Sequence, residues 1–209
     1  MSGNQYGGGI GLWIHNLEEE GETIIQFTNC QFLDNQNLRS TSPYQNGGAL
    51  QFGYTSSVVP TALSFSNCQF QRNQCLSGKG GALSLGVNKN ITIHQCTFQD
   101  NEAQEGGAIC FWGKKVISVS PDQVVPDTQL EFITITESHF IGNKGGDVSG
   151  ICVEEENIKV TKVQISSCDF SGNSDDKTKM LIQSSCTNFE FTENTVEFAT
   201  HFGAALILT

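Results

Sequence analysis

Eight cysteines offer the most distinctive chemistry in this chain. No two of them have the Cys-x-x-Cys spacing that is typical of structural zinc sites and thioredoxin-like centres. Four of them stand two residues before a phenylalanine: Cys30, Cys68, Cys96 and Cys168. If these equivalent positions lie on adjacent strands about 4.8 Å apart, their Cβ atoms are farther apart than the ~3.8 Å of a disulfide. We therefore expect packed, reduced thiols, no metal and no cofactor, and leave a disulfide through Cys75 open.

Acidic residues are the second candidate for chemistry, because enzymes that cleave polysaccharides pair carboxylates with a histidine or an arginine base. Asp175 and Asp176 form the only adjacent aspartate pair, and Arg39 and Arg72 lie far from it in the sequence. We expect no enzyme, and keep as the alternative a protein that binds a polysaccharide or cleaves one as a lyase or glycoside hydrolase. The two Glu triplets, at 18–20 and 154–156, are expected to be solvated turns, with weak Ca²⁺ binding left open.

Hydroxyl side chains could form an ice-binding face if Thr-x-Thr pairs recurred at equivalent positions. Thr134 and Thr136 form such a pair, and no neighbouring repeat has another. This class of function is therefore disfavoured.

Charge and length exclude further classes of function. The chain has 209 residues and a net charge of -11, from 22 acids against 11 Lys plus Arg. This balance argues against binding to nucleic acids or to anionic membranes. No apolar run approaches the ~20 residues of a membrane-spanning helix, so we expect no direct membrane insertion. The first residues have neither the basic nor the apolar segment of a signal peptide.

A repeat organises these residues. Apolar residues fall at offsets 0, 2, 5 and 7 and an asparagine at offset 10, as in the run from Ile91 to Asn101. Further copies begin at Ile25, Leu63, Ile133 and Val163. A degenerate sixth copy is assigned as Ser184, Cys186, Phe189, Phe191 and Asn194. Short β-branched and aromatic runs between turn residues indicate an all-β fold.

A second element follows most copies and supplies a third strand. It is clearest at 47–50, 80–83 and 106–109, each Gly-Gly-Ala followed by Leu or Ile, and weaker at 145–148. The step of three between offsets 2 and 5 breaks the period of two, so the chain must bend there. These elements predict a right-handed, single-stranded parallel β-helix of the pectin lyase-like kind, with about six to seven rungs. We expect residues 1–209 to form one such domain, as a segment of a longer solenoid.

Equivalent positions in a β-helix become ladders along its axis. The predicted phenylalanine ladder is Phe32, Phe70, Phe98, Phe140, Phe170 and Phe191. The predicted asparagine ladder is Asn35, Asn73, Asn101, Asn143, Asn173 and Asn194. We expect each asparagine to adopt the left-handed conformation of a tight turn and to bond to the amide one rung away.

The Phe-x-x-Asn and Gly-Gly-Ala-Ile/Leu motifs resemble the repeat of chlamydial polymorphic outer membrane proteins, which also occurs in large protist surface proteins. The resemblance implies a β-helix displayed on a cell surface, often as an adhesin, and it implies no catalytic residues. It therefore leads us to expect a structural or adhesive segment, at the cell surface or outside the cell, within a longer secreted protein.

Insertions at the turns are the expected contact points, because loops there can grow without disturbing the stack. The longest runs from 112 to 131 and carries Trp112, Lys114 and Lys115; a shorter one, at 36–46, carries Arg39 and Tyr44. A tryptophan beside two lysines is a plausible contact for a protein or glycan partner, with a hairpin that merely covers a rung as the alternative. The sequence shows no polar cap: it begins inside a repeat and ends on the apolar run Ala204-Ala205-Leu206-Ile207-Leu208-Thr209, so we also expect end-to-end self-association.

Overall fold

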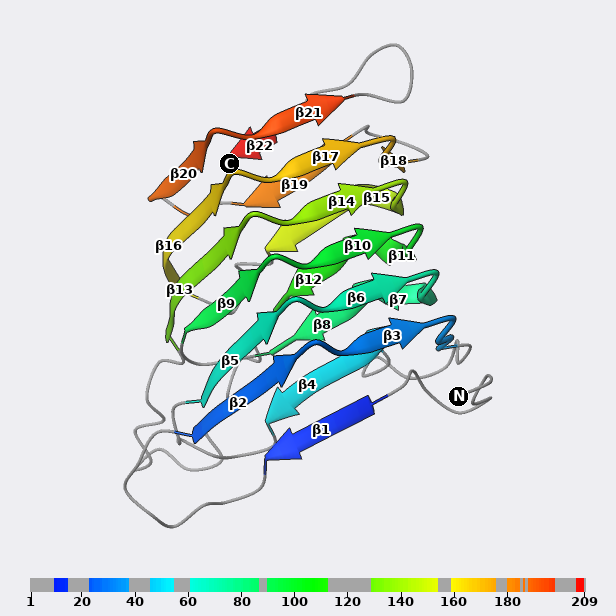
Figure 1. The fold of residues 1–209 in the computed structure, drawn as a ribbon, viewed down its shortest axis with the longest axis vertical. Coiled ribbons are helices and arrows are strands. Elements are labelled where there is room, and N and C mark those ends of the chain that lie inside the picture. The colour runs from blue at the N-terminus through cyan, green and yellow to red at the C-terminus, as the bar shows by residue number, and fades with distance from the viewer. Residues whose placement is uncertain are drawn as a thin grey trace, which may run out of the picture.

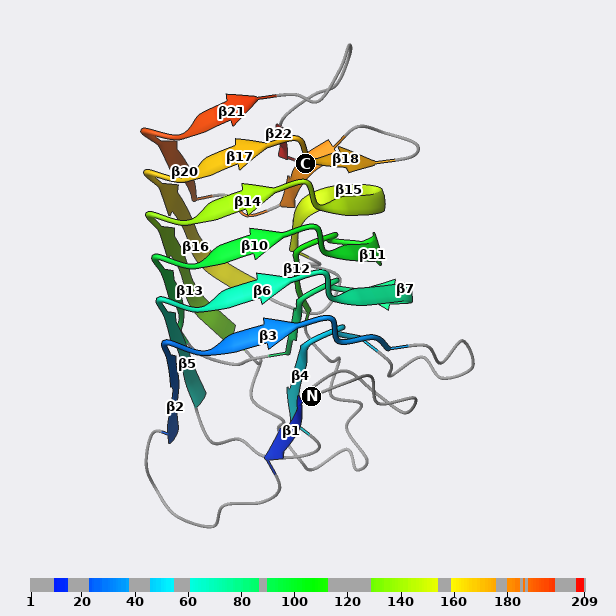
Figure 2. The ribbon, with the colours of Figure 1, turned by 45° about the vertical axis from the view of Figure 1, so that its right-hand side comes forward.

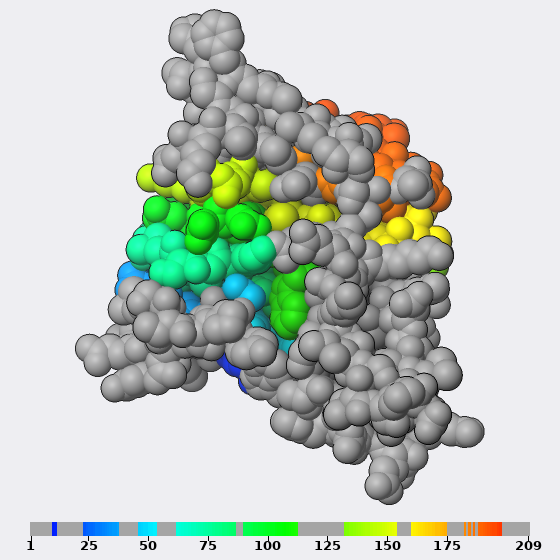
Figure 3. Space-filling view, turned by 180° about the vertical axis from the view of Figure 1, so that it is seen from behind, coloured from blue at the N-terminus to red at the C-terminus, as the bar shows by residue number. Residues whose placement is uncertain are grey.

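The computed structural model describes residues 10–14, 23–37, 46–54, 61–86, 90–112, 129–153, 159–175, 180–184, 186, 188–197 and 206–208. Every pairing between strands in these segments is parallel, and the strands lie in three sheets. Successive coils stack along one axis (Figure 1), and bands of colour follow one another in chain order from behind (Figure 3). The predicted all-β class and parallel β-helix are confirmed.

Each coil passes through the three sheets in turn. The first sheet contains β2 (Thr23–Thr28), β5 (Thr61–Ser66), β9 (Ile91–His94), β13 (Gln129–Thr136), β16 (Lys159–Ser166) and β20 (Phe189–Thr192). The second sheet contains β3 (Gln31–Leu33), β6 (Gln69–Gln71), β10 (Thr97–Gln99), β14 (His139–Ile141), β17 (Asp169–Ser171) and β21 (Thr195–Glu197).

The third sheet is the largest. Its main strands are β1 (Ile10–Ile14), β4 (Leu50–Tyr54), β8 (Leu83–Leu85), β12 (Ile109–Phe111), β15 (Lys144–Val153), β19 (Met180–Ser184) and β22 (Leu206–Leu208). The short strands β7 (Gln74–Lys79), β11 (Glu102–Glu105) and β18 (Ser174–Asp175) continue it beside β15. In Figure 2 these short strands project away from the coil at its right-hand side.

Alternation along the strands explains why the coil closes around a core. In β9, Ile91 and Ile93 are fully buried, whereas Thr92 between them is exposed. In the short strand β10 only the central Phe98 is buried. Because successive side chains point to opposite faces, such a strand contributes one apolar row to the interior and one polar row to the outside.

The phenylalanine ladder fills this interior. Phe32, Phe70, Phe98, Phe140 and Phe170 pair in register across five rungs. Their neighbouring rings stack nearly parallel, with centroids 4.7–4.9 Å apart. The ring spacing therefore equals the rung spacing of the sheet.

The asparagine ladder bonds one rung to the next. The Nδ2 of Asn73 donates to Oδ1 of Asn101 at 2.9 Å and to the backbone oxygen of Phe32 at 3.0 Å. The same amide-to-amide bond, also 2.9 Å, joins Asn35 to Asn73 and Asn101 to Asn143. The predicted bond between neighbouring amides is thus present in the structure.

The left-handed residue of this turn stands one position earlier than we predicted. Asp34, Arg72 and Asp100 have φ between 52° and 57°, and Gly142 and Gly172 have φ of 62° and 63°. None of the ladder asparagines has a positive φ. Their side chains bond instead to the neighbouring rungs, as Asn73 does to Asn101. The asparagine's function at this turn is therefore hydrogen bonding, and its neighbour supplies the sharp backbone bend.

The sixth repeat was assigned five residues out of register. Phe191 pairs with Ile165 in the first sheet, and Val196 occupies the place beside Phe170. Asn194 lies at the cysteine position, where its Oδ1 accepts a hydrogen bond from the backbone N–H of Cys168 at 2.8 Å. Phe189 and Phe191 satisfy both frames because each frame has two apolar residues two positions apart, at offsets 0 and 2 and again at offsets 5 and 7. Phe191 and Asn194 therefore do not belong to the ladders predicted for them.

The fourth glycine element was also assigned out of register. Ile151 rather than Val148 pairs with Ile109, and Gly145 pairs with Ala103 on the short strand β11. At this rung the chain continues as one ten-residue strand, β15, with a bulge in place of the glycine turn.

Candidate binding surface around Trp112

Trp112 is the one predicted contact residue that lies in the described part of the chain. It follows β12, in which Ile109 and Phe111 point into the core. The alternation places Trp112 on the outer side of the third sheet, where its backbone N–H donates to the oxygen of Leu85 at 3.0 Å. The indole is half-buried. Figure 3 looks onto this side and shows a green segment of the chain, coloured as residues near 110, reaching the surface.

Two residues of the neighbouring rung hold the indole in place. Its Nε1–H donates to Oγ of Ser84 at 2.8 Å. A Cβ built on Gly86 would lie 2.8 Å from Cζ2 of the indole, so the ring lies directly over that glycine. The indole of Trp112 is therefore held in a fixed position and spans two rungs.

The remaining predicted contact residues are Lys114, Lys115, Arg39 and Tyr44, and all four lie outside the described residues. Sequence reasoning missed Ser84 and Gly86 as partners of Trp112. The signal was available, because aligning Gly-Gly-Ala-Leu at 80–83 with Gly-Gly-Ala-Ile at 106–109 brings Gly86 opposite Trp112. A glycine opposite an outward tryptophan indicates that the ring lies flat on the sheet.

Five of the cysteines lie in two distinct buried environments. Cys68, Cys96 and Cys168 line the main core, whereas Cys110 and Cys152 pair in register on the outer side of the third sheet. Both are almost fully buried with Val148. None of the eight cysteines forms a disulfide in the structure. Burial raises the pKa of Cys96 to about 12 and that of Cys168 to about 11. These groups are therefore thiols at neutral pH, and poor nucleophiles.

Cys75, for which a disulfide was left open, is also a reduced thiol. It is 1% exposed, and burial raises its pKa to about 11. A buried, protonated thiol of this kind acts as a small packing group.

Several ionisable groups outside the core form ion pairs between rungs. The guanidinium of Arg72 makes two bonds to the carboxylate of Asp34, at 2.6 and 2.7 Å, and this contact lowers the pKa of Asp34. Lys79 pairs with Glu105 at 3.0 Å. Among the described residues, no group of three or more His, Cys, Asp or Glu side chains is placed to hold a metal ion. The arrangement around Trp112 is suited to binding by surface contact.

The three sheets, their stacked rungs and the two internal ladders define a parallel β-helix repeat protein. Within this fold, residues 95–111 match the Chlamydia polymorphic membrane protein repeat. The matched segment begins at the turn before Cys96, includes Phe98 and Asn101, and ends with Phe111 in the third sheet. The resemblance inferred from the motifs is confirmed for this repeat.

Two further comparisons gave no match, neither among curated proteins nor among solved structures. In the described part of the chain, no helix has the length and apolar character needed to cross a membrane.

Proposed function

We propose that the chain is a non-catalytic β-helix segment of a cell-surface protein and that its role is structural or adhesive. The observation that carries this proposal is the match of residues 95–111 to a repeat named for membrane proteins of Chlamydia, on a rung whose geometry recurs along the stack. A solenoid of this kind extends a surface over many rungs while each rung contacts only its neighbours.

The location is tested on intact cells. An epitope tag is inserted next to the repeat in the full-length gene, and the cells are treated with a protease before and after lysis. Removal of the tag from intact cells supports surface display. A tag that resists the protease until lysis contradicts it.

Within this function we assign partner contact to the surface formed by Trp112 and the 112–131 insertion. Trp112 supports the assignment because its indole is fixed by Ser84 and Gly86 and is still partly exposed. Aromatic side chains held rigid before binding lose little entropy on contact and often anchor interfaces. A protein or a glycan would satisfy such a site.

Replacing residues 113–128 with a short Asn-Gly turn tests this assignment. The change removes the insertion and keeps Trp112 with its partners Ser84 and Gly86. Melting should change little, whereas adhesion of cells carrying the full-length protein should be lost. Trp112→Ala in the intact loop separates the contribution of the ring. Undiminished adhesion in both variants rejects this surface.

A polysaccharide-cleaving β-helix is the competing proposal. It is disfavoured because Arg72, the arginine in the described segments, is bound to Asp34 on an exposed turn. Release of reducing ends or unsaturated products from a panel of polysaccharides would favour it. We also propose that copies associate end to end, which sedimentation at increasing concentration tests.

A further inference from the structure

The outer face of the first sheet is flat, and it differs in chemistry from the rest of this acidic molecule. Its strands run side by side in Figure 1, and Figure 2 shows the sheet edge-on at the left. The middle outward row, in register from rung to rung, is Gln26, Ser64, Thr92, Thr134, Gln164 and Glu190. Five of these six side chains end in a hydroxyl or a neutral amide.

The next outward row continues this pattern. It contains Thr28, Ser66, His94, Thr136, Ser166 and Thr192, again in register. Nδ1 of His94 lies 2.9 Å from Oγ1 of Thr136, so the imidazole is tied to the hydroxyl row. The two rows present hydrogen-bonding groups at every rung, about 4.8 Å apart along the axis.

Charge is sparse in these two rows. In the two rows, Glu190 is the one acidic side chain, and its carboxylate is paired with Lys162 at 2.9 Å. The whole chain has a net charge of -11. The two rows are therefore a neutral strip on an acidic protein, which suits an uncharged ligand better than an ionic one.

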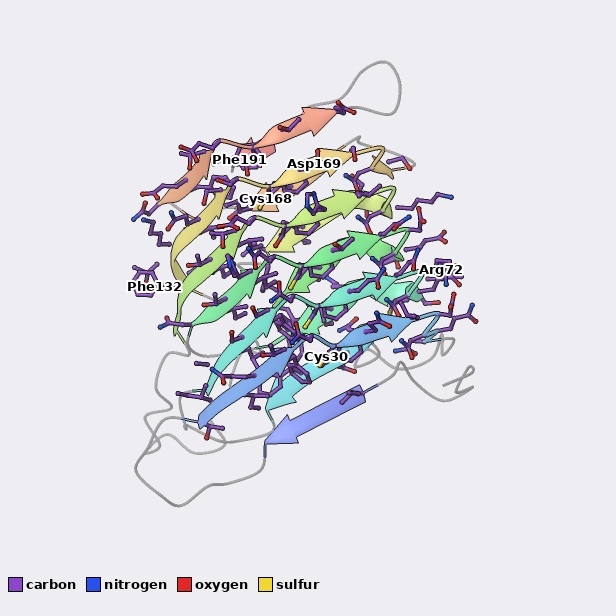
Figure 4. All side chains as sticks on the ribbon, in the orientation of Figure 1. Cys30, Arg72, Phe132, Cys168, Asp169 and Phe191 are labelled. Atoms are coloured by element: carbon purple, nitrogen blue, oxygen red, sulfur yellow. The ribbon has the colours of Figure 1, made fainter. Side chains whose placement is uncertain are left out.

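Large apolar side chains border the hydroxyl rows. Phe132 is 41% exposed and Ile24 is 60% exposed, although both belong to strands of the first sheet. Figure 4 shows Phe132 at the outer edge of β13, pointing away from the coil. Phenylalanine side chains are costly to leave in water, and an aromatic ring beside hydroxyl and amide groups can stack on the apolar face of a sugar.

We propose that this face binds a linear, neutral polysaccharide that lies along the helix axis, across the strands. The repeating rows would bond to successive sugar hydroxyls, and Phe132 would stack on one ring. A nucleic acid or a polyuronate is disfavoured, because the rows carry no unpaired cation to meet its charges. The proposal concerns a different surface from Trp112 and does not depend on where the protein is displayed.

Binding of the purified chain to a soluble neutral β-glucan, a mannan and polygalacturonate is measured by calorimetry. We expect one of the neutral polymers to bind, and Phe132→Ala to raise its Kd about tenfold, as loss of an aromatic anchor does. Thr134→Glu, which places a charge in the middle row, should weaken binding at least as much. Leu76→Ala is the matched control, because Leu76 is 51% exposed on β7 of the third sheet, and it should leave Kd unchanged.

Thr134→Val provides a variant that preserves the β-branched shape and hence the fold, and it should weaken binding through loss of the hydroxyl alone. Circular dichroism confirms that each variant melts as the parent does. The proposal is overturned if neither neutral polymer binds, if polygalacturonate binds more tightly, or if Phe132→Ala and Thr134→Glu bind as the parent does. Thermal hysteresis of ice growth without polysaccharide binding would overturn it as well.

Discussion

Asn101 shows what one ladder residue contributes. Its Nδ2 donates to the backbone oxygen of Phe70 and to Oδ1 of Asn143, and its Oδ1 accepts from the backbone N–H and the amide of Asn73. The residue is 0% exposed, so water cannot replace these bonds. Each buried group that loses its partner costs about 1–3 kcal/mol.

Asn101→Ala should therefore destabilise the protein by about 2–4 kcal/mol, measured by denaturant unfolding. The control is Gln99→Ala, because Gln99 is a half-buried, outward-facing residue of β10 and should change stability by less than about 0.5 kcal/mol. Equal losses in the two variants would show that the amide ladder contributes nothing specific.

Cys96 predicts a dependence of stability on pH. Its pKa rises from 9.0 to about 12 on folding because the thiol is desolvated. The folded state therefore holds this proton more tightly than the unfolded state does, and the stabilisation is complete below pH 9 and lost as pH rises toward 12. Cys96→Ser should make the decline in unfolding free energy above pH 9 less steep. Ser138 already occupies the same position one rung away, where its Oγ accepts from the backbone N–H of Cys96. Parallel pH profiles for the two proteins would contradict this account.

Residue-level prediction from sequence succeeded where one side chain has one physical role. The amide of an asparagine repeated at offset 10 can bond along the axis, and it does so from Asn35 to Asn173. The prediction failed where two residues share a turn. Asp34 or Arg72 adopts the positive φ, whereas the asparagine that follows makes the hydrogen bonds. Spacing alone does not divide these roles.

At the scale of the strand, the phenylalanine stack should carry much of the core energy. Phe98 lies between Phe70 and Phe140, with ring centroids 4.8 and 4.9 Å away. Phe98→Ala should cost about 3–5 kcal/mol, as truncation of buried aromatic residues does. Phe132→Ala, which removes an exposed ring, is the control and should cost far less. A melting temperature that Phe98→Ala leaves unchanged would refute the stack.

The glycine pair that precedes β12 is constrained by close contact between rungs. A Cβ on Gly107 would collide with the backbone oxygens of Ser149 and Lys144, and neither can move without breaking the sheet. Gly107→Ala should therefore lower the melting temperature strongly. Gly146→Ala should lower it less, because its Cβ would meet only the region of Gln104, at 2.9 Å from the oxygen. The reverse order would contradict the register given for β15.

Element-level prediction was accurate for the central rungs and wrong at two others. Between Leu63 and Asn143 the apolar offsets and the asparagine agree, so only one frame fits. In the sixth repeat, Phe189 and Phe191 fit two frames five residues apart, and the pairing with Val163 and Ile165 decides between them. Pairing with a neighbouring rung is a property of the stack, which local spacing does not contain.

For the whole molecule, the architecture followed from the repeat, but the binding surfaces did not. Trp112 was found from its position in an insertion, whereas its support by Ser84 required the register of β8 and β12. The hydroxyl rows of the first sheet were missed because Thr134 and Thr136 were compared only with other Thr-x-Thr pairs. Stacking shows that Ser64 and Thr92 continue the row.

The most direct test of the account is the distance between Gln26 and outward residues of the same row. Spin labels introduced as non-natural amino acids at Gln26 paired with Thr134, Gln164 or Glu190 span three, four and five rungs. The account predicts backbone separations of about 14, 19 and 24 Å, because each rung adds about 4.8 Å whatever the length of the loop between them. Separations that do not rise by one constant step per rung would contradict the parallel β-helix.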